Sequence, residues 1–467
     1  MPYTNRRPTL ELSERKIALR IMDVLMAILS IGFTGYFLSL NYIDIHNEKL
    51  WTWIITYAVY FLFFGYVFEL YDLKIADRVF PTIRSLFITT LITTGVFALT
   101  PRLTPVLPEQ RIEILVLFFA AFTGVFIWRV FYVSIFTRDR FNKNLAFVGD
   151  IGSLKYLEEF TKKSETRFNI LGALLVGEAD KVDKVDGIPN INRTGQSLYE
   201  FIVKRNVDEL IVCKDSFHKE DERISKELAD AFEQGINIRS LGDFYSDLNE
   251  CIPRTYLGSN FFEHLNFSSS HSNRFYLYFS RVLDILFAIV GLTLFSFLIP
   301  FIVLGNILGN RGSFFYKQKR MGKKERPFQI IKLRTMVKDA EKNGAQYAQK
   351  NDSRITWFGR ILRNTRLDEV PQLINVLKGE MKMIGPRPER LVFIEELSEI
   401  SPFYKMRHTM SPGLTGWAQV KYPYANSVEE QEKKLRYDLY YLKNRSFYLD
   451  FQIIVKTVTT VLFFRGQ

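Results

Sequence analysis

The sequence predicts a membrane protein of the α/β class that has three parts. These are a four-helix transmembrane bundle (1–142), a Rossmann-like middle domain (143–265) and a C-terminal α/β domain (272–467) with a re-entrant membrane helix at about 281–308. Long apolar blocks crowd the first third of the 467 residues, and short apolar runs alternate with amphipathic stretches in the middle. One more long apolar block precedes mixed sequence at the end.

Four apolar blocks in the first third predict four membrane spans, because each is close to the roughly 20 residues that a helix needs to cross a bilayer. They lie at about 17–40, 50–70, 83–99 and 112–136. Basic residues collect before the first block, between the second and third, and after the fourth, so both ends of the bundle are predicted to be cytoplasmic. Arg129, inside the fourth block, is expected to extend its side chain to the lipid headgroups.

The middle of the chain predicts a parallel sheet covered by helices, since short apolar runs alternate with charged amphipathic stretches from Asn144 onward. Its first strand ends in the residues 149–152, Gly-Asp-Ile-Gly, which lack the full GxGxxG spacing of a dinucleotide site. This pattern favours a structural or oligomerising role, such as a homodimer, over dinucleotide binding. The segment 254–272 is expected to be a connector.

The apolar block at 281–308 contains Pro300 and is followed at once by a dense basic run. Such a run prefers the cytoplasmic side of a membrane. Pro300 removes one helical hydrogen bond and clashes with the preceding turn, so it can bend the helix back toward the face it entered. The pattern favours a re-entrant helix broken at Pro300, with a kinked fifth span as the alternative.

The net charge of +12 indicates partners with negative charge. No zinc-finger, homeodomain or RNA-motif signature accompanies the charge, so anionic lipid and phosphorylated ligands are favoured and nucleic acid is not expected. The only cysteines, Cys213 and Cys251, are too far apart for a CxxC unit and have no clustered histidines beside them. They are expected to be reduced structural thiols.

Two adjacent carboxylates, Asp368 and Glu369, precede a predicted helix that begins near Pro371 and ends at Gly379. The start of a helix carries the positive end of the backbone dipole and unpaired N–H groups, so it favours anions such as phosphate. Two carboxylates at such a position suggest Mg²⁺ together with a phosphorylated substrate.

Basic residues from two other segments complete the predicted site. Lys332 and Arg334 have the same parity on a predicted strand at 328–336, so they share one face. Together with Arg387 of a Gly-Pro-Arg-Pro turn, they are predicted to clamp a diphosphate.

The chain from about Arg281 onward resembles the bacterial sugar transferase family, the monotopic type of polyprenyl-phosphate phosphoglycosyl transferase. The resemblance rests on five blocks in order: RVLDILFAIVGL, QKRMGKKERPFQIIKLRTM, DSRITWFGRILRNTRLDEVPQLINVLKGEMKMIGPRPER, SPGLTGWAQVKYPY and EKKLRYDLYYLKNRSFYLD. The four spans and the Rossmann-like part resemble the larger undecaprenyl-phosphate glucose or galactose phosphotransferases. The YPY segment and the closing LFFRG resemble the exosortase-associated exopolysaccharide branch.

The resemblance implies transfer of a sugar 1-phosphate from a UDP-sugar to undecaprenyl phosphate, with release of UMP, as the priming step of exopolysaccharide or O-antigen synthesis. It implies the bacterial inner membrane, with the middle and last domains cytoplasmic, and other polysaccharide biosynthesis enzymes as partners. It makes Asp368 the nucleophile and Glu369 its partner, with Mg²⁺ held by this pair. The remaining implied site residues are the phosphate-binding Arg387, Lys332, Arg334 and Arg320, and the nucleotide-sugar pocket residues Gln318, Thr415 and Gly416.

Two other functions stay open, as does the identity of the sugar. One is a non-catalytic membrane assembly protein of the polysaccharide machinery, and the other is a nicotinamide-dependent oxidoreductase that uses the middle domain. The family pattern is also interrupted here, because Ile299 and Lys382 stand where serines are usual. The apolar run at 451–464 is too short to span a bilayer and suits either an interfacial helix or a buried core helix.

Overall fold

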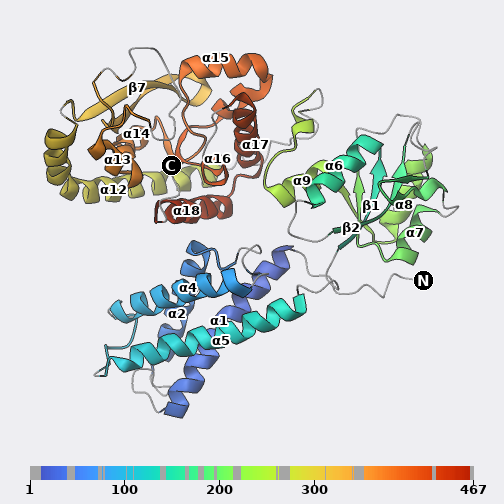
Figure 1. The fold of residues 1–467 in the computed structure, drawn as a ribbon, viewed down its shortest axis with the longest axis horizontal. Helices are drawn as coiled ribbons and strands as arrows, with labels where there is room; N and C mark the ends of the chain where they lie inside the picture. The colour runs from blue at the N-terminus through green and yellow to red at the C-terminus, as the bar shows by residue number, and fades with distance from the viewer. Residues whose placement is uncertain are drawn as a thin grey trace. The chain divides into compact units, whose positions relative to one another are not determined.

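The computed structural model divides into two compact units, Met1–Phe244 and Tyr245–Gln467 (Figure 1). The residues that it describes are 12–38, 48–71, 76, 79–100, 102–108, 110–136, 143–162, 168–176, 183–193, 197–213, 222–258, 261, 274–310, 312–338, 340, 352–422 and 427–462.

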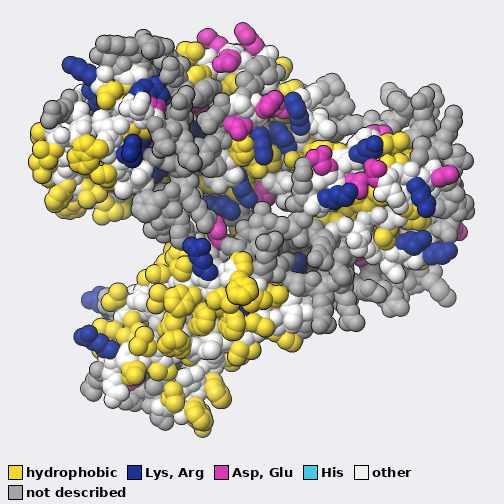
Figure 2. All heavy atoms as spheres, viewed as in Figure 1, with side chains coloured by type: hydrophobic (Ala, Val, Ile, Leu, Met, Phe, Trp, Pro, Cys, Tyr) yellow, Lys and Arg dark blue, Asp and Glu magenta, His cyan; other side chains and the backbone are white. Residues whose placement is uncertain are grey.

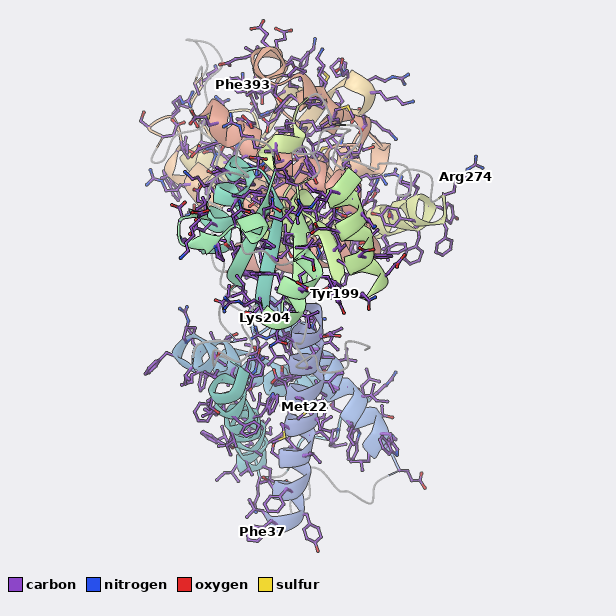
Figure 3. The ribbon with its side chains drawn as sticks, turned by 90° about the vertical axis from the view of Figure 1, so that its right-hand side faces the viewer. Met22, Phe37, Tyr199, Lys204, Arg274 and Phe393 are labelled. Carbon is purple, nitrogen blue, oxygen red and sulfur yellow. The ribbon has the colours of Figure 1, made fainter. Side chains whose placement is uncertain are left out.

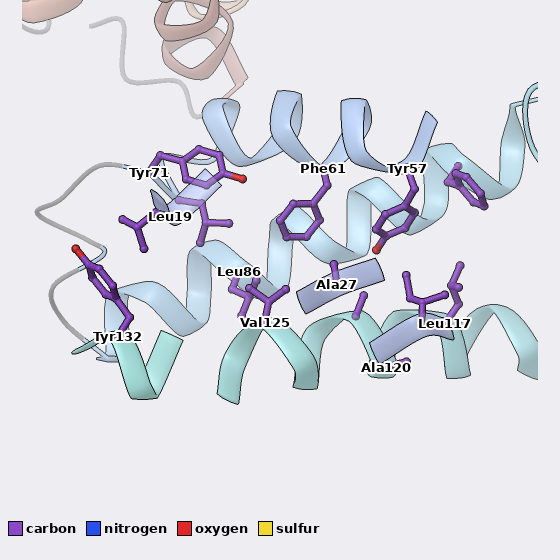
Figure 4. Close-up of a cluster of buried hydrophobic side chains, with 14 of the residues drawn as sticks. Leu19, Ala27, Tyr57, Phe61, Tyr71, Leu86, Leu117, Ala120, Val125 and Tyr132 are labelled. Atoms are coloured by element: carbon purple, nitrogen blue, oxygen red, sulfur yellow. The ribbon is translucent and has the colours of Figure 1, made fainter. Parts of the chain in front are cut away.

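Four long apolar helices open the first unit: α1 (Leu12–Leu38), α2 (Leu50–Val67), α4 (Val79–Leu99) and α5 (Ile112–Phe136). Each is long and apolar enough to cross a membrane, as predicted. Hydrophobic side chains dominate their outer surface (Figure 2), and Phe37 projects outward at one end of α1 (Figure 3). Their inner faces meet in one buried cluster that includes Leu19, Phe61, Leu86 and Val125, one from each helix (Figure 4).

Arg129 is buried inside this group of helices and does not extend to the headgroups, so that prediction was wrong. Its guanidinium donates to the Asp23 carboxylate of α1, with Nε–Oδ1 and Nη2–Oδ2 distances of 2.9 and 2.5 Å. Nη2 also donates to the carbonyl oxygen of Leu70 at 3.0 Å. Arg129 is 1% exposed and Asp23 is 0% exposed. The Asp23 carboxylate and the Leu70 carbonyl therefore accept the hydrogen bonds that water would accept from an exposed arginine.

We expect Arg129→Met to destabilise the folded protein by about 3–5 kcal/mol, because it leaves the Asp23 carboxylate buried without its cation. The double variant Asp23→Leu/Arg129→Met should regain most of that loss, since no charge stays buried. Thermal unfolding in detergent measures both effects, with exposed Arg84→Met as the control. A single variant as stable as the wild type would contradict this account.

The rest of the first unit is the predicted parallel α/β fold. Four strands pair in the order β2-β1-β5-β6, and every pair is parallel. The strands are β1 (Lys143–Gly149), β2 (Phe168–Leu175), β5 (Glu209–Val212) and β6 (Asn237–Ser240), and the helices are α6 (Ile151–Lys162), α7 (Leu198–Arg205), α8 (Glu222–Glu233) and α9 (Leu241–Asn249). A short hairpin, β3 (Lys184–Val185) with β4 (Ile188–Pro189), follows β2.

The turn after β1 is filled by the chain's own side chains. The Asp150 carboxylate accepts hydrogen bonds from the Ser153 backbone N–H at 2.9 Å and from its hydroxyl at 2.7 Å. A Cβ at Gly149 would lie 2.8 Å from Cβ of Cys213. A carboxylate at the start of α6 repels phosphate, so this turn is unfavourable for a dinucleotide.

The second unit contains one long apolar helix, α12 (Arg274–Gly309), and the shorter elements that follow it. A hairpin follows, with β7 (Phe315–Met321) antiparallel to β8 (Pro327–Leu333). The later elements are α13 (Trp357–Asn364), the 3-10 turn η7 (Leu367–Gln372), α14 (Leu373–Lys378), β9 (Lys382–Ile384), α15 (Leu391–Ile400), η8 (Pro402–Thr409), β10 (Gly413–Thr415), α16 (Trp417–Lys421), α17 (Val428–Asn444) and α18 (Phe447–Leu462). Strands β9 and β10 are parallel.

The residues after Phe244 pack into the second unit, so α9 crosses the division between the two units. Ile252, Tyr256 and Phe261 belong to its main hydrophobic core. The Trp417 indole N–H donates to the carbonyl of Glu250 at 2.9 Å. Residues 262–273 of the predicted connector lie outside the described part of the chain.

Helix α12 is hydrogen-bonded to the rest of the second unit near both of its ends. Near its start, the Arg281 guanidinium donates to the carbonyls of Val376 and Leu377 at 2.6 and 2.9 Å. At its end, the Asn310 amide donates to the Arg334 carbonyl at 2.8 Å and accepts from the Thr356 hydroxyl. Pro300 lies inside the helix, and Figure 1 shows the helix changing direction toward its C-terminal end.

Helix α18, which forms most of the closing apolar run, has one buried face and one exposed apolar face. Residues 463–464 of that run lie outside the described part of the chain. One of its faces is buried in the core through Leu449 and Ile453. The other exposes Phe447, Tyr448 and Phe451. Such a helix is suited to lie at an interface with apolar surroundings.

Candidate active site

Asp368 and Glu369 lie within the 3-10 turn η7, one turn before the regular helix. The turn begins after Arg366, whose φ of 58° is left-handed, and it includes Pro371. The helix α14 then starts at Leu373 and ends at Gly379, which adopts φ of 84° as a left-handed cap. The predicted cap at Gly379 is confirmed. Pro371 lies in the 3-10 turn, which runs directly into α14, and Asp368 and Glu369 occupy the first turn of this continuous helical segment.

Glu369 is the centre of a cluster of cations. Its Oε1 atom lies 2.8 Å from the Lys332 ammonium and 3.1 Å from Nη2 of Arg387, and its Oε2 lies 3.7 Å from Nη1 of Arg366. Burial by itself would raise the pKa of Glu369, but Lys332 and Arg387 outweigh it and hold that pKa well below its usual range. Glu369 is therefore ionised at any physiological pH.

Asp368 has the opposite environment. Its side chain is 8% exposed. Burial, with the added repulsion of Glu369, raises the pKa of Asp368 to about 6, although Lys332 and Arg363 oppose the rise. Two adjacent carboxylates thus differ in proton affinity, a pattern that marks groups with different chemical roles.

Lys332 reaches Glu369 because a buried amide joins its strand to the helix behind the carboxylates. The Asn375 side chain of α14 accepts from the Ile331 N–H at 3.1 Å and donates to the Gln329 carbonyl at 2.7 Å. The two contacts lie one and three residues before Lys332, and together they set the register of β8 against α14. The sequence argument did not identify Asn375, since an asparagine within a short helix carries no distinctive signal.

Arg334 does not join Lys332. Its Nε donates to the carbonyl of Met336 at 3.0 Å, and its Nη1 lies 3.4 Å from the Ser313 hydroxyl. The parity argument fails here because β8 ends at Leu333, and residues beyond the end of a strand no longer alternate between two faces.

The segment that carries Arg387 is an irregular turn from Gly385 to Glu389, called here the PRP turn. Each of its last four carbonyl oxygens accepts a hydrogen bond from a different residue of the surrounding structure. The donors are Gly413 N–H to Pro386 at 2.8 Å, Arg407 Nη2 to Arg387 at 3.1 Å, Arg320 Nη1 to Pro388 at 3.3 Å and Met321 N–H to Glu389 at 3.0 Å. The turn is therefore fixed by tertiary contacts and not by secondary structure.

The first residue of the PRP turn packs backbone to backbone against two other glycines. A Cβ at Gly413 would lie 2.0 Å from the Gly385 nitrogen, and a Cβ at Gly416 would lie 2.1 Å from the Gly385 oxygen. Neither distance admits a side chain, so all three positions require glycine. The predicted pocket residue Gly416 thus acts first through its backbone.

Thr415 and Gln419 flank Gly416 on either side of this contact. The Thr415 hydroxyl lies 2.6 Å from that of Thr457 on α18. Gln419, which the sequence argument missed, accepts from Nη1 of Arg387 through Oε1 at 3.3 Å. Arg387 is therefore oriented at one nitrogen by an amide and at the other by Glu369.

Gln318 and Arg320 lie on one face of β7 and are bonded to each other, with Arg320 Nη2 donating to Gln318 Oε1 at 2.7 Å. Arg320 also lies 3.9 Å from the Glu389 carboxylate. Burial lowers the pKa of Arg320 to about 10. In the structure Arg320 supports the PRP turn, and its contact with a substrate phosphate stays a prediction.

The carboxylate pair fits a magnesium ion only as a partial ligand set. Among the described residues, no three His, Cys, Asp or Glu side chains gather as a metal site. Mg²⁺ commonly binds one or two carboxylates and takes its other ligands from water and substrate phosphates. Asp368 and Glu369 would suffice in that arrangement, with a bound diphosphate supplying the remaining oxygens.

We expect Asp368→Asn to stabilise the protein at neutral pH by on the order of 1–2 kcal/mol, because it removes a buried charge beside Glu369. A group whose folded pKa is raised gives stability that is lost as pH rises through that pKa. The gain should therefore be present at pH 7.5, shrink as the pH falls below about 6, and disappear only near pH 3.8, below which Asp368 is protonated in both the folded and the unfolded state.

Thermal unfolding in EDTA at pH 7.5 and near pH 3.8 measures this difference. The comparison variant is Glu369→Gln, which should destabilise the protein at pH 7.5, since it leaves Lys332 and Arg387 without their shared carboxylate. An Asp368→Asn variant that is less stable than the wild type at pH 7.5 would refute the account.

Comparison with known proteins agrees with this site. Residues 275–464 match the family described as bacterial sugar transferase. A UDP-N-acetylgalactosamine-undecaprenyl-phosphate N-acetylgalactosaminephosphotransferase of Aeromonas hydrophila is 42% identical over 187 residues, which are 40% of this chain and 44% of that protein. A putative undecaprenyl-phosphate N-acetylgalactosaminyl 1-phosphate transferase of Bacillus subtilis is 47% identical over 145 residues, 30% of this chain and 79% of that protein.

A third relative is the UDP-glucose:undecaprenyl-phosphate glucose-1-phosphate transferase of Escherichia coli, 36% identical over 180 residues, which cover 38% of this chain and 39% of that protein. The chain thus spans less than half the length of the Aeromonas and Escherichia relatives, and the family match lies within the second structural unit. The match includes the carboxylate pair, the PRP turn and the strand that carries Lys332. On this evidence the chain belongs to the bacterial sugar transferase family.

Proposed function

We propose that this protein transfers a sugar 1-phosphate from a UDP-sugar to undecaprenyl phosphate and releases UMP, as the first membrane step of a polysaccharide pathway. The observation that carries the proposal is the pair of buried carboxylates with Lys332 and Arg387 on Glu369. The names of the relatives support the lipid acceptor and the transferred sugar phosphate. Cations of this kind would hold the diphosphate of a nucleotide sugar.

In the proposed reaction Asp368 is the nucleophile. Its carboxylate oxygen attacks the phosphorus that bears the sugar, the bond from that phosphorus to the bridging oxygen of the diphosphate breaks, and UMP leaves with the electron pair. A phosphate oxygen of undecaprenyl phosphate then attacks the same phosphorus and displaces the carboxylate. The product is undecaprenyl diphosphate sugar, and Asp368 returns to its starting form.

The other residues prepare this exchange without bonding to phosphorus. Glu369 stays ionised and keeps Lys332 and Arg387 in place, so both cations are positioned before substrate arrives. Mg²⁺, when bound by the carboxylate pair, would neutralise charge on the diphosphate. Asp368 is a nucleophile only when it is deprotonated, so activity should rise as pH increases through about 6.

The contacts of α12 support a re-entrant path through the membrane. A straight helix of 36 residues would be about 54 Å long, well beyond the roughly 30 Å hydrocarbon core of a bilayer. A crossing helix would place its ends on opposite sides, yet Arg281 and Asn310 both bind the same soluble unit. Large apolar side chains such as Phe287, Phe297 and Phe301 are exposed between these ends. We therefore propose that α12 enters and leaves by the cytoplasmic face of the inner membrane.

This path predicts that Lys204→Cys, which precedes α12, and Ser313→Cys, which follows it, react with a membrane-impermeant thiol reagent from the same side, since both positions are exposed. The natural cysteines, Cys213 and Cys251, are buried and should give little background. Labelling in intact cells and in inverted vesicles distinguishes the two faces. Reaction of the two variants from opposite faces would establish a fifth span instead.

The reaction itself is tested by incubating purified protein with Mg²⁺, undecaprenyl phosphate and a panel of UDP-sugars while UMP is measured. We expect release with one sugar, loss of release in EDTA, and a decrease of roughly three orders of magnitude or more in Asp368→Asn. Glu395→Gln, an exposed carboxylate on α15, is the control and should behave as the wild type. An Asp368→Asn protein with near-normal UMP release would exclude the proposed nucleophile, and silence across the panel in folded wild type would favour a non-catalytic assembly role.

A further inference from the structure

Arg387 contacts Glu369 from the PRP turn, which contains no helix or strand. Arg407 of η8 contacts the backbone of that turn. Its side chain is buried, with 3% of the residue exposed. Nη2 of Arg407 donates to the carbonyl oxygen of Arg387 at 3.1 Å. Of the four carbonyl contacts that fix the PRP turn, this one acts on the residue that binds Glu369.

Arg407 also contacts two other side chains. Nη2 lies 2.7 Å from Oδ2 of Asp438 on α17, and Nη1 donates to the Tyr404 hydroxyl at 2.6 Å. Asp438 is 2% exposed, so the ion pair is removed from water. The same guanidinium nitrogen therefore connects a carboxylate of α17 with the backbone of the catalytic turn.

A buried ion pair is weak evidence for a role in stability, since a well-packed apolar pair often serves a fold equally well. Such a pair can instead orient a neighbouring group, because a planar guanidinium offers its hydrogen-bond donors at fixed angles. Here Nη1 donates to Tyr404, while Nη2 lies against Asp438 and donates to a single backbone oxygen, that of Arg387. A hydrogen bond from a charged donor is also stronger than a neutral one.

We infer that Arg407, held by its ion pair with Asp438, is a positioning residue that sets Arg387 against Glu369 through the carbonyl oxygen of Arg387. Arg407 touches no substrate in this account and acts only through Arg387. The inference deepens the proposed function, since it rests on Arg387 as a ligand of the diphosphate. Its structural part, the placement of the PRP turn, can be measured without any activity.

The decisive comparison is Arg407→Lys against Tyr404→Phe. Lysine keeps a positive charge for Asp438 but, as a single ammonium on a flexible stem, does not hold the carboxylate and the carbonyl in one fixed geometry. Tyr404→Phe removes another hydrogen bond from the same guanidinium and leaves its donor to Arg387 in place. Both variants disturb the same buried cluster, so a general loss of packing affects both.

We expect kcat for UMP release to fall by about tenfold to a hundredfold in Arg407→Lys, as for a misplaced catalytic group, and to change by less than about twofold in Tyr404→Phe. In a protein that already carries Arg387→Ala, Arg407→Lys should not lower kcat further, because Arg407 acts only through Arg387. An undiminished decrease in that protein, or equal kcat values for the two single variants, would overturn the inference.

Hydrogen exchange followed by mass spectrometry gives the readout that does not depend on turnover. The Gly385 N–H is bonded to the Thr415 carbonyl at 2.9 Å at the base of the PRP turn, so its exchange reports on that turn. We expect faster exchange in a peptide that begins before Gly385, such as 382–390, in Arg407→Lys than in Tyr404→Phe. Equal exchange in the two variants overturns the inference even if wild-type protein releases no UMP, whereas an inactive wild type with the expected exchange refutes only the proposed function.

Discussion

The buried carboxylate of Glu369 is the constraint on which the second unit depends. A negative charge removed from water is unfavourable unless cations and hydrogen bonds replace the solvent. Lys332 and Arg387 do so from two segments that are far apart in the sequence. Each segment then needs its own support, which Asn375 provides for the strand and Arg407 for the turn. The polar architecture of the domain follows from this one requirement.

The same arrangement separates the two neighbouring carboxylates by environment. Glu369 is surrounded by cations and stays ionised, whereas burial and the charge of Glu369 raise the pKa of Asp368. One carboxylate is thereby suited to hold charge, and the other is suited to react. Neighbours that share a chemical type can do different work when their surroundings differ. A membrane helix packed at both ends against this unit would bring the reactive carboxylate close to a lipid-bound acceptor.

Much of the architecture could be predicted because its signals are local. The apolar blocks predicted the long helices, and alternation of short strands and helices predicted the parallel sheet. Gly379 predicted the end of its helix, since a left-handed cap favours glycine. The errors occurred where a tertiary partner overrides a local rule. Arg129 found a carboxylate on another helix, and Arg334 lies just beyond the end of its strand.

The sequence by itself determined the family and the long apolar helices, and it predicted a site at the carboxylate pair with its basic residues, because residue types and short spacings carry that information. Only the tertiary structure decided which cations reach Glu369, that Asn375 and Gln419 assist them, and that Arg407 contacts the backbone of Arg387. The physical reason is that these contacts join side chains and backbone atoms across the fold. A hydrogen bond over tens of residues leaves no periodic pattern in a single sequence, so its partners become visible only when the chain is folded.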